Sequence, residues 1–304
     1  MERIVDIETD GRHLATSRGF MTVSAGREEA GRVPLDDILA VIVHAHGVTY
    51  SNNLLVALTK RRAGLVVCAS NHAPVACLWP LDGHHEQGAR MRAQLAATLP
   101  LRKQAWRHIV AAKIRMQGAI LEAAGRPTGA FDLLARKVRS GDPENVEAQA
   151  ARRYWPLLMG EDFRRDQGGS GANALLNYGY TVLRAATSRA VAAAGLHPTL
   201  GVHHANRANS FALADDLMEP FRPLVDWSVL RCLRDGTETL CPETKRHLVA
   251  VIGGDIRVEG ERSTVSTALQ RLAGSYARAC LSGKPGLVLP EPPSGLDLAG
   301  LAPP

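Results

Sequence analysis

The sequence predicts an α+β protein in which an N-terminal β-rich domain precedes a C-terminal all-α domain. Three observations support this: β-branched apolar runs punctuated by Gly, Pro and Asn before residue 87, a polar Gly-containing stretch at 81–85, and long stretches with few helix breakers beyond it. A chain of 304 residues can bury a sizeable core in two domains. We expect a β-rich domain at 1–87, an all-α domain at 88–282 and a Pro- and Gly-rich tail at 283–304.

Five strands and one helix are expected in the first domain. Residues 38–43 are the strongest candidate for a buried strand, because six consecutive apolar residues fit a strand covered on both faces. A helix over 51–62 can be capped by its first residue, a serine, and Leu54, Leu55 and Leu58 give it an apolar face. The predicted strands are residues 3–7, 20–24, 38–43, 65–68 and 75–79.

Helical patterns dominate the second domain. Residues 87–123 contain almost no helix breaker besides Pro100. Asp142 can cap a further helix, which would have Pro143 at its first position and run to Tyr154. The tail, rich in Pro and Gly, is expected to be loosely ordered. The remaining helices are predicted at residues 171–194, 209–219, 221–233 and 263–281.

Composition argues against several classes of protein. The longest apolar run, residues 38–43, is far shorter than the roughly 20 residues of a membrane-spanning helix. Asp6, Glu8 and Asp10 leave no apolar segment for a secretory signal near the N-terminus. The five cysteines form no C-x-x-C pair, so neither a disulfide framework nor a zinc ribbon is expected, and a cytoplasmic location fits best.

Basic residues are concentrated in the middle of the chain. The formal net charge is +6, but residues 90–165 alone hold fifteen Lys and Arg against seven Asp and Glu. Such an excess suits a surface that follows a phosphate backbone, although a solvated helix face would show the same composition.

Three segments carry residues that could take part in catalysis or bind a metal. Glu147 lies in a predicted helix among small alanines, which would let another element approach its carboxylate. A loop punctuated by Gly and Pro delivers His203 and His204, and an extended backbone would point only one of them into a given site. Asp216 and Glu219 stand three residues apart on one predicted helix face, with a helix break expected after Glu219. Each group could equally be an ordinary solvated or hydrogen-bonding side chain.

Taken together, these groups fit one hard divalent metal. Carboxylate and imidazole ligands suit Mg²⁺ or Mn²⁺. An acidic site in a basic protein would repel phosphate unless a cation bridged the two, and a metal on a phosphodiester oxygen solves this problem. The pattern therefore favours a metal-dependent phosphodiester enzyme.

The same segments, in this order, resemble the CRISPR-associated integrase and endonuclease of spacer acquisition, the universal adaptation endonuclease, in its type II-like subtype. The resemblance covers residues 1 to about 285. The main motifs are NVEA at 145–148, AAR at 150–152, GVHH at 201–204 and DLMEPFRP at 216–223. Further stretches that look like this subtype are residues 34–38, 72–74, 100–106 and 109–114.

The resemblance implies an architecture and a set of partners. The family has a β-rich domain that forms homodimers and an all-α catalytic domain. Two dimers flank a dimer of a small second adaptation subunit in a heterohexamer. The complex joins the 3′-OH ends of short double-stranded DNA, the protospacer, to a CRISPR repeat by transesterification, in antiviral defence. Whether the type II effector nuclease is a further partner stays open, and no membrane is involved.

The resemblance also assigns roles to residues. Glu147, His204 and Glu219 match the three metal ligands, and Asp216 matches an auxiliary acidic residue one turn before Glu219. His204 is preferred to His203 by its spacing to the acidic pair. Candidates for phosphate contacts are Arg102, Lys103, Arg107, Lys113, Arg136, Lys137 and Arg139.

Other functions remain compatible with the sequence. A stand-alone structure-specific DNA nuclease in repair could use the same site. A non-catalytic DNA-binding scaffold would need only the basic segment, and so would an enzyme directed at RNA.

Overall fold

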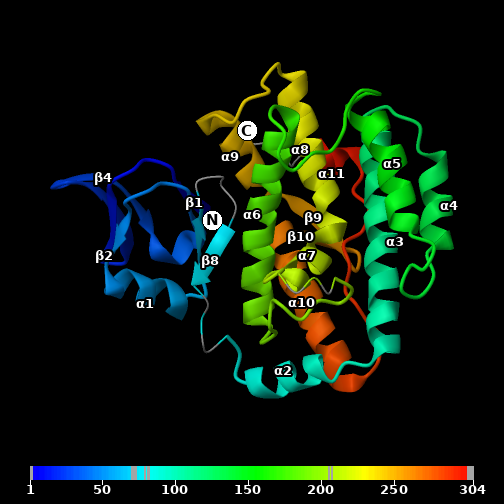
Figure 1. Cartoon of the computed structure of the whole chain (residues 1–304), viewed down its shortest axis with the longest axis horizontal. Coiled ribbons are helices and arrows are strands. Elements are labelled where there is room, and N and C mark those ends of the chain that lie inside the picture. Colours follow the sequence, from blue (N-terminus) through cyan, green and yellow to red (C-terminus); the bar gives the residue numbers. More distant parts are fainter. Residues whose placement is uncertain are drawn as a thin grey trace. The chain divides into compact units, whose positions relative to one another are not determined.

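A computed structural model of the chain describes residues 3–69, 74–78, 80, 83–204, 206 and 208–299. The chain divides into two compact units, an N-terminal unit at Met1–His85 and a C-terminal unit at Glu86–Pro304 (Figure 1). The N-terminal unit holds two four-stranded sheets, and the C-terminal unit is mainly helical, as the α+β prediction requires. The division falls two residues before the predicted boundary at 87.

The N-terminal unit contains every strand and the helix predicted for it within the described residues. The predicted helix begins after Ser51, whose hydroxyl accepts a hydrogen bond from the backbone N–H of Leu54 at 3.3 Å. Three strands were not predicted, because their sequences are mixed, mostly exposed or only two residues long. The elements are β1 Arg3–Ile7, β2 Arg12–Ser17, β3 Phe20–Ala25, β4 Glu28–Pro34, η1 Leu35–Asp37, β5 Ile38–Val43, β6 Thr49–Tyr50, α1 Asn52–Lys60, β7 Gly64–Cys68 and β8 Pro74–Leu78.

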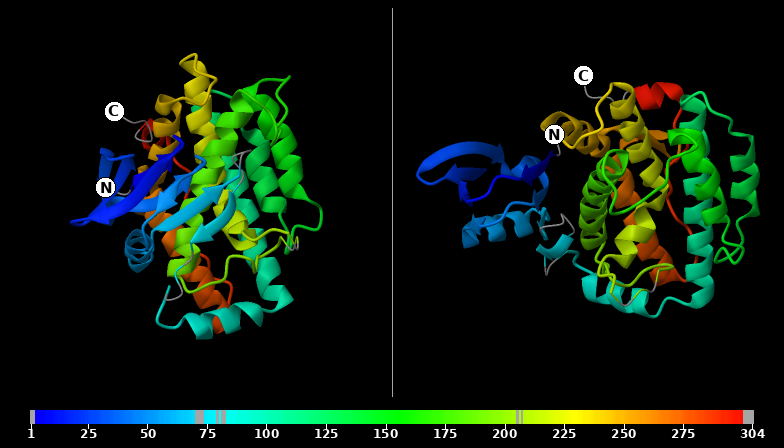
Figure 2. Two further views of the ribbon diagram at one scale, coloured as in Figure 1. Left: turned by 60° about the vertical axis from the view of Figure 1, so that its left-hand side comes forward. Right: turned by 45° about the horizontal axis from the view of Figure 1, so that its top comes forward.

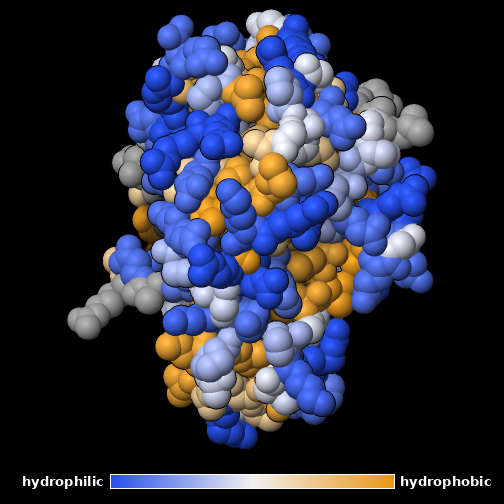
Figure 3. All heavy atoms as spheres, turned by 90° about the vertical axis from the view of Figure 1, so that its right-hand side faces the viewer, coloured by the Kyte–Doolittle hydropathy of each residue, from blue (hydrophilic) through white to orange (hydrophobic). Residues whose placement is uncertain are grey.

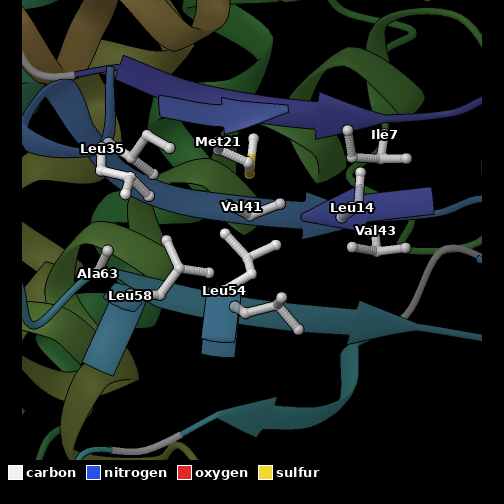
Figure 4. Close-up of a cluster of buried hydrophobic side chains, with 11 residues drawn as sticks. Ile7, Leu14, Met21, Leu35, Val41, Val43, Leu54, Leu58 and Ala63 are labelled. Atoms are coloured by element: carbon white, nitrogen blue, oxygen red, sulfur yellow. The ribbon is translucent and has the colours of Figure 1, made fainter. Parts of the chain in front are cut away.

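The two sheets of the N-terminal unit enclose an apolar core with α1. One sheet has the order β1-β5-β7-β8 and the other β4-β3-β2-β6. All six residues of β5 are buried, and its neighbours β1 and β7 run parallel to it. Figure 4 shows Met21, Val41 and Leu54 from different elements converging on one cluster. Burying each such side chain contributes about 1.5–3 kcal/mol, so this cluster stabilises the unit.

The C-terminal unit is built around two long helices, α3 and α6. α3 spans Leu99–Ala123 and α6 spans Ala172–Ala193, close to the predicted 171–194. The other elements are α2 Gln87–Leu95, α4 Gly129–Lys137, α5 Val146–Met159, α7 Ala212–Met218, η2 Glu219–Phe221, α8 Arg222–Arg234, α9 Pro242–Ala250, η3 Val251–Gly253, β9 Asp255–Val258, β10 Glu261–Thr264, α10 Val265–Ser282 and α11 Gly295–Ala299.

Several boundaries in this unit differ from the predicted ones. The helical segment at 87–123 forms two helices, because Thr98 caps α3 by accepting a hydrogen bond from the N–H of Leu101. Helices α4 and α9 were not predicted. An antiparallel hairpin of β9 and β10 makes this unit helical with one small sheet rather than entirely α.

The segment after Ser282 is packed, so the prediction of a loosely ordered tail is wrong for its described part. The N–H of Val288 donates to Ser275 Oγ at 2.9 Å, and the N–H of Glu291 donates to the carbonyl of Arg257 at 2.9 Å. Leu298 is fully buried. The Pro- and Gly-rich composition predicted a loosely ordered tail, but these hydrogen bonds hold the tail against β9 and α10.

Packing among the helices places the three candidate catalytic segments around α3. α3 packs against α4, α5, α8 and η2, while α6 packs against α7, α8, α9 and α10 (Figure 2). Gly179 allows α6 and α8 to approach closely, because a Cβ atom there would lie 2.4 Å from Cγ1 of Val225. Among the described residues, no helix combines the length and apolar character that crossing a membrane requires.

Candidate functional site

A pocket of about 250 Å³ lies within the C-terminal unit and brings together the predicted ligand residues. It receives side chains from α3, the turn before α5, α5 itself, the loop between α6 and α7, and η2. Its lining residues are Trp106, Asp142, Asn145, Glu147, His203, His204 and Glu219. The three segments singled out in the sequence thus meet at one place, although 72 positions separate Glu147 from Glu219.

The turn before α5 aims Glu147 into the pocket. Asp142 and Asn145 both adopt positive φ angles, 48° and 51°, which Asp and Asn tolerate better than most residues. The Asp142 carboxylate accepts hydrogen bonds from the N–H groups of Val146 at 2.9 Å and Glu147 at 3.0 Å. The N-cap of α5 is Asn145, whose Oδ1 accepts a hydrogen bond from the N–H of Ala148, and Asp142 binds the first turn from outside the helix. The prediction that Asp142 is the cap and Pro143 the first helical residue is therefore wrong, since the helix begins at Val146.

The loop between α6 and α7, residues 194–211, is anchored to two helices. Gln94 of α2 accepts from the N–H of His197 at 2.8 Å and donates to the carbonyl groups of His197 and Leu200. Arg102 of α3 donates through Nε to the carbonyl of Val202 at 3.0 Å. These side chains fix the backbone that presents the two histidines.

His203 and His204 have different environments. The ring of His203 stacks on Trp106 with centroids 4.4 Å apart and planes at 4°, and burial lowers its pKa. His204 Nδ1 contacts Asp216 Oδ1, and this hydrogen bond raises the pKa of His204. A carboxylate on Nδ1 leaves Nε2 as the nitrogen available to a metal, which favours His204 as the ligand.

Asp216 is the fully buried centre of the histidine loop. Its Oδ2 accepts from the N–H of His203 at 2.8 Å and of His204 at 3.3 Å, while Oδ1 contacts the His204 ring. Gly201 leaves room for this arrangement, because a Cβ there would lie 2.5 Å from the carbonyl oxygen of His204 and 2.9 Å from Asp216 Oδ2. Asp216 therefore orients His204, in keeping with the auxiliary role predicted for it.

Glu219 is buried between two cations. It opens the 3-10 turn η2, so the predicted helix break next to it is present. Arg222 Nε lies 2.9 Å from Glu219 Oε1, and Lys113 Nζ lies 2.5 Å from Glu219 Oε2. Burial opposes the charge of Glu219, but Arg222 and Lys113 outweigh burial and lower its pKa.

Lys113 also reaches the second carboxylate of the pocket. Its Nζ lies 2.5 Å from Glu147 Oε1, so one ammonium group bridges α5 and η2. Burial opposes the charge on Lys113, yet Glu219 and Glu147 raise its pKa above the ordinary value. Lys113 therefore lies against two residues that line the pocket, and their carboxylates pair with its ammonium group. Its contact with DNA phosphates stays a prediction.

Arg222 connects the pocket to a buried polar group behind it. The Cζ atom of Arg222 lies 4.8 Å from the ring centroid of Tyr180, whose hydroxyl donates to Asp226 Oδ1. Asp226 is 2% exposed, and burial raises its pKa to about 7. An aromatic ring on one side and Glu219 on the other fix the guanidinium of Arg222 in place.

The donors in the pocket fit a divalent cation. Glu147, His204 and Glu219 offer carboxylate oxygens and an imidazole nitrogen, the donor types that Mg²⁺ and Mn²⁺ accept. The Lys113 ammonium shows that positive charge is already held between the two carboxylates. Among the described residues, the ligand atoms that all lie within 4.8 Å of one another are instead those of His84, His85 and Glu86. The predicted three ligands would have to move closer together to share an ion.

The other basic residues proposed for DNA contact lie outside the pocket. Arg102 is half-buried and bound to the histidine loop, whereas Lys103 and Arg107 are exposed on α3. Arg136, Lys137 and Arg139 are exposed at and after the end of α4, and Arg139 pairs with Glu144. Figure 3 faces the side of the C-terminal unit that carries α4, and hydrophilic side chains gather over much of it.

Sequence reasoning missed several contributors to the site. Trp106 occurs in a stretch that was noticed only for its likeness to a family, and Lys113 was predicted to contact phosphates rather than the two carboxylates. Arg222 stands three residues after Glu219, a spacing that signals a contact on one helix face. No signal in the sequence could have identified Gln94, because its partners lie about 100 positions away.

Comparisons of the whole chain with known proteins identify its family. A family model described as "CRISPR associated protein Cas1" matches residues 5–240. The CRISPR-associated endonuclease Cas1 of Neisseria meningitidis serogroup C (strain 8013) is 37% identical over 252 residues, which cover 82% of this chain and 83% of that protein.

Solved structures share the fold. A casposase bound to its integration product aligns with a TM-score of 0.79 at 20% identity, over 95% of this chain and 93% of the casposase. A Cas6-RT-Cas1–Cas2 complex aligns with a TM-score of 0.73 at 17% identity, over 95% of this chain and 36% of that chain.

Proposed function

The chain belongs to the Cas1 family of CRISPR-associated proteins, and we propose that it is a divalent-metal-dependent DNA integrase and endonuclease of CRISPR adaptation. The observation that supports this most directly is the pocket in which Glu147, His204 and Glu219 converge from three separate segments. The endonuclease name of the Neisseria relative and the integration product of the casposase point to the same chemistry. The type II-like subtype stays a prediction.

The proposed ligands of the cation are Glu147, His204 and Glu219, and the cation is Mg²⁺ or Mn²⁺. When bound, it would supply Lewis-acid stabilisation of the charge that develops on the phosphate. Asp216 orients His204 and keeps its Nδ1 engaged. Arg222 fixes one oxygen of Glu219, which leaves the other oxygen for the cation.

The proposed reaction is a direct transesterification. The 3′-OH oxygen of the incoming strand attacks the target phosphorus, the bond from phosphorus to the leaving 3′ oxygen breaks, and that oxygen takes up a proton. The chain contributes by holding the two strands in line, and no side chain acts as a nucleophile. Water in place of the 3′-OH would give endonuclease cleavage.

The proposed partners are DNA and other adaptation subunits. We assign the contacts with the phosphates of the protospacer and the CRISPR repeat to Arg102, Lys103, Arg107, Arg136, Lys137 and Arg139. We further propose a homodimer formed through the β-rich unit, and a heterohexamer with the small second adaptation subunit. A similar chain in a Cas6-RT-Cas1–Cas2 complex supports the pairing with that subunit.

Strand transfer into a plasmid tests the proposal. A labelled duplex with 3′-OH ends is incubated with a supercoiled plasmid carrying a CRISPR repeat and Mn²⁺, with and without the partner subunit. Wild type should join the duplex to the plasmid, and Glu147→Gln should lower the rate of joining by about 100- to 1,000-fold, by analogy with the loss of other charge-stabilising groups. Equal rates of joining by wild type and Glu147→Gln would contradict the assignment of Glu147 to the active site. Binding of the duplex without joining by wild type would favour a non-catalytic DNA-binding scaffold.

A further inference from the structure

Lys113, which contacts two residues that line the pocket, has no role in the proposed reaction. Lys113 projects from α3, its side chain is 12% exposed, and its Nζ lies 2.5 Å from an oxygen of both Glu147 and Glu219. These carboxylates belong to α5 and η2, so Lys113 is the group that joins the two proposed carboxylate ligands.

Without a cation, the pocket would place two carboxylates close together in a partly buried site. Like charges in such a place repel and raise the free energy of the fold. Lys113 offsets this repulsion, because its single ammonium group lies within ion-pair distance of one oxygen of each carboxylate. Its ion pairs hold together elements that are 34 and 106 positions away in the sequence.

Lys113 and Arg222 differ in how firmly they are held. Arg222 pairs with Oε1 of Glu219 and packs its guanidinium over the ring of Tyr180. Lys113 ends in a compact ammonium on a flexible four-carbon stem, which can withdraw without breaking a planar contact. It uses Oε2 of Glu219 and Oε1 of Glu147, the oxygens that Arg222 leaves open. Arg222 is thus held by an ion pair and an aromatic ring, whereas the contacts given for Lys113 are made by its ammonium group.

We infer that the Lys113 ammonium is an internal substitute for the divalent cation, which keeps Glu147 and Glu219 assembled in the metal-free protein and must leave when the ion binds. This inference rests on the proposed function, since it concerns the same two ligands. Two cations on the same oxygens repel each other, so ion binding and the Lys113 ion pairs compete. Lys113 is a positioning residue that sets the affinity of the site.

The test compares Mn²⁺ binding by the full-length wild type and Lys113→Met. Methionine has a stem of similar length but no charge. Free Mn²⁺ is measured by electron paramagnetic resonance during a titration, and melting temperatures are recorded with and without Mn²⁺. Lys113→Met should bind Mn²⁺ about tenfold more tightly or better, because no competitor remains. It should melt at a lower temperature than wild type without metal and recover with it.

Two further variants make the result specific. Lys60→Met removes the same charge from an exposed position in α1 and should leave Mn²⁺ affinity unchanged. Lys113→Arg keeps the competing charge and should bind Mn²⁺ no more tightly than wild type. If Lys113→Met does not fold, amine labelling of wild type decides: Mn²⁺ should expose Lys113 to acetylation, and unchanged protection would overturn the inference.

The possible outcomes separate this inference from the proposed function. Equal Mn²⁺ affinity in wild type and Lys113→Met, or weaker binding by the variant, would overturn the competition while leaving the metal site in place. Binding by neither protein would overturn the metal site and the inference together. Tighter binding by Lys113→Met, with no change in Lys60→Met, is the result that the inference requires.

Discussion

The two units of the molecule bury different kinds of side chain. The core of the N-terminal unit is a cluster of aliphatic residues, and its buried polar residues within the described chain are Thr22 and His44 (Figure 4). The C-terminal unit has an apolar core as well, but it also contains all the buried carboxylates of the described residues. These are Asp142, Asp215, Asp216, Glu219 and Asp226.

The aliphatic cluster of the N-terminal unit and the buried carboxylates of the C-terminal unit affect the protein in different ways. An aliphatic cluster lowers the free energy of the fold without requiring any partner. Buried carboxylates cost free energy unless cations and hydrogen bonds surround them, and in this unit two of them, Asp142 and Glu219, line the pocket. The predictions below should therefore change stability in one unit and ion binding or DNA binding in the other.

The largest effect on stability is expected from Leu54→Ala in the aliphatic cluster. Leu54 is fully buried, so the substitution should lower the free energy of unfolding of the N-terminal unit by about 2–5 kcal/mol. Urea denaturation measures this loss. Val56→Ala, in the same helix but 42% exposed, is the matched control and should cost far less. A change in Mn²⁺ affinity in Leu54→Ala would break the separation between the units.

Asp216→Asn should weaken Mn²⁺ binding by about 10- to 100-fold, because the amide cannot replace both contacts of the carboxylate with His204. A titration of Mn²⁺ measures the effect. Asp215→Asn removes a neighbouring buried carboxylate that pairs with Arg184, and its effect should be much smaller. Similar losses in both variants would mean that general charge, rather than orientation of the imidazole, controls the site.

Reversing the charges of Lys103 and Arg107 to Glu should weaken duplex binding at low salt by removing phosphate contacts. The slope of log affinity against log salt should become shallower by about 2, close to one unit for each contact. Lys60→Glu with Arg27→Glu applies the same charge change to exposed positions of the N-terminal unit and should leave the slope nearly unchanged. An unaltered slope in the α3 variant would exclude these residues from the DNA surface.

A separate effect is expected in the pH dependence of stability, through Asp226. Burial raises the pKa of Asp226 from 3.8 to about 7, so the folded protein holds this proton more tightly than the unfolded chain does. Its contribution to the free energy of unfolding is complete below about pH 4 and is lost as the pH rises toward 7.

Asp226→Asn lacks this proton, so wild type should lose stability relative to the variant between pH 5 and pH 8. Urea denaturation at both pH values measures the difference. Asp162→Asn, an exposed position, should follow wild type. Parallel pH dependence in wild type and Asp226→Asn would show that the buried carboxyl does not titrate in this range.

Local signals in the sequence predicted much of the fold. Strand β5 and helix α6 follow from an apolar run and from a helix that ends at a glycine, features that depend on neighbours in the chain. The hairpin β9–β10 and the packed tail were missed, because their stability comes from contacts with distant segments. Val288, for example, is held by the hydroxyl of Ser275.

The candidate site divides in the same way. The motifs around Glu147, His204 and Glu219 could be recognised, because each is a short local pattern. Lys113 was predicted to contact phosphates, and its ion pairs could not be predicted because they join elements far apart in the sequence. A lysine in a basic helix carries no local sign that its partners are two carboxylates.

Mn²⁺ binding by wild type and by Glu147→Gln tests the central claim most directly. The claim is that Glu147, His204 and Glu219 of the C-terminal unit form one divalent-metal site, and that this site does not depend on the aliphatic core of the N-terminal unit. Wild type and Leu54→Ala should bind Mn²⁺ with the same affinity, and Glu147→Gln should lose that binding while still folding. Undiminished Mn²⁺ binding by Glu147→Gln would contradict the account.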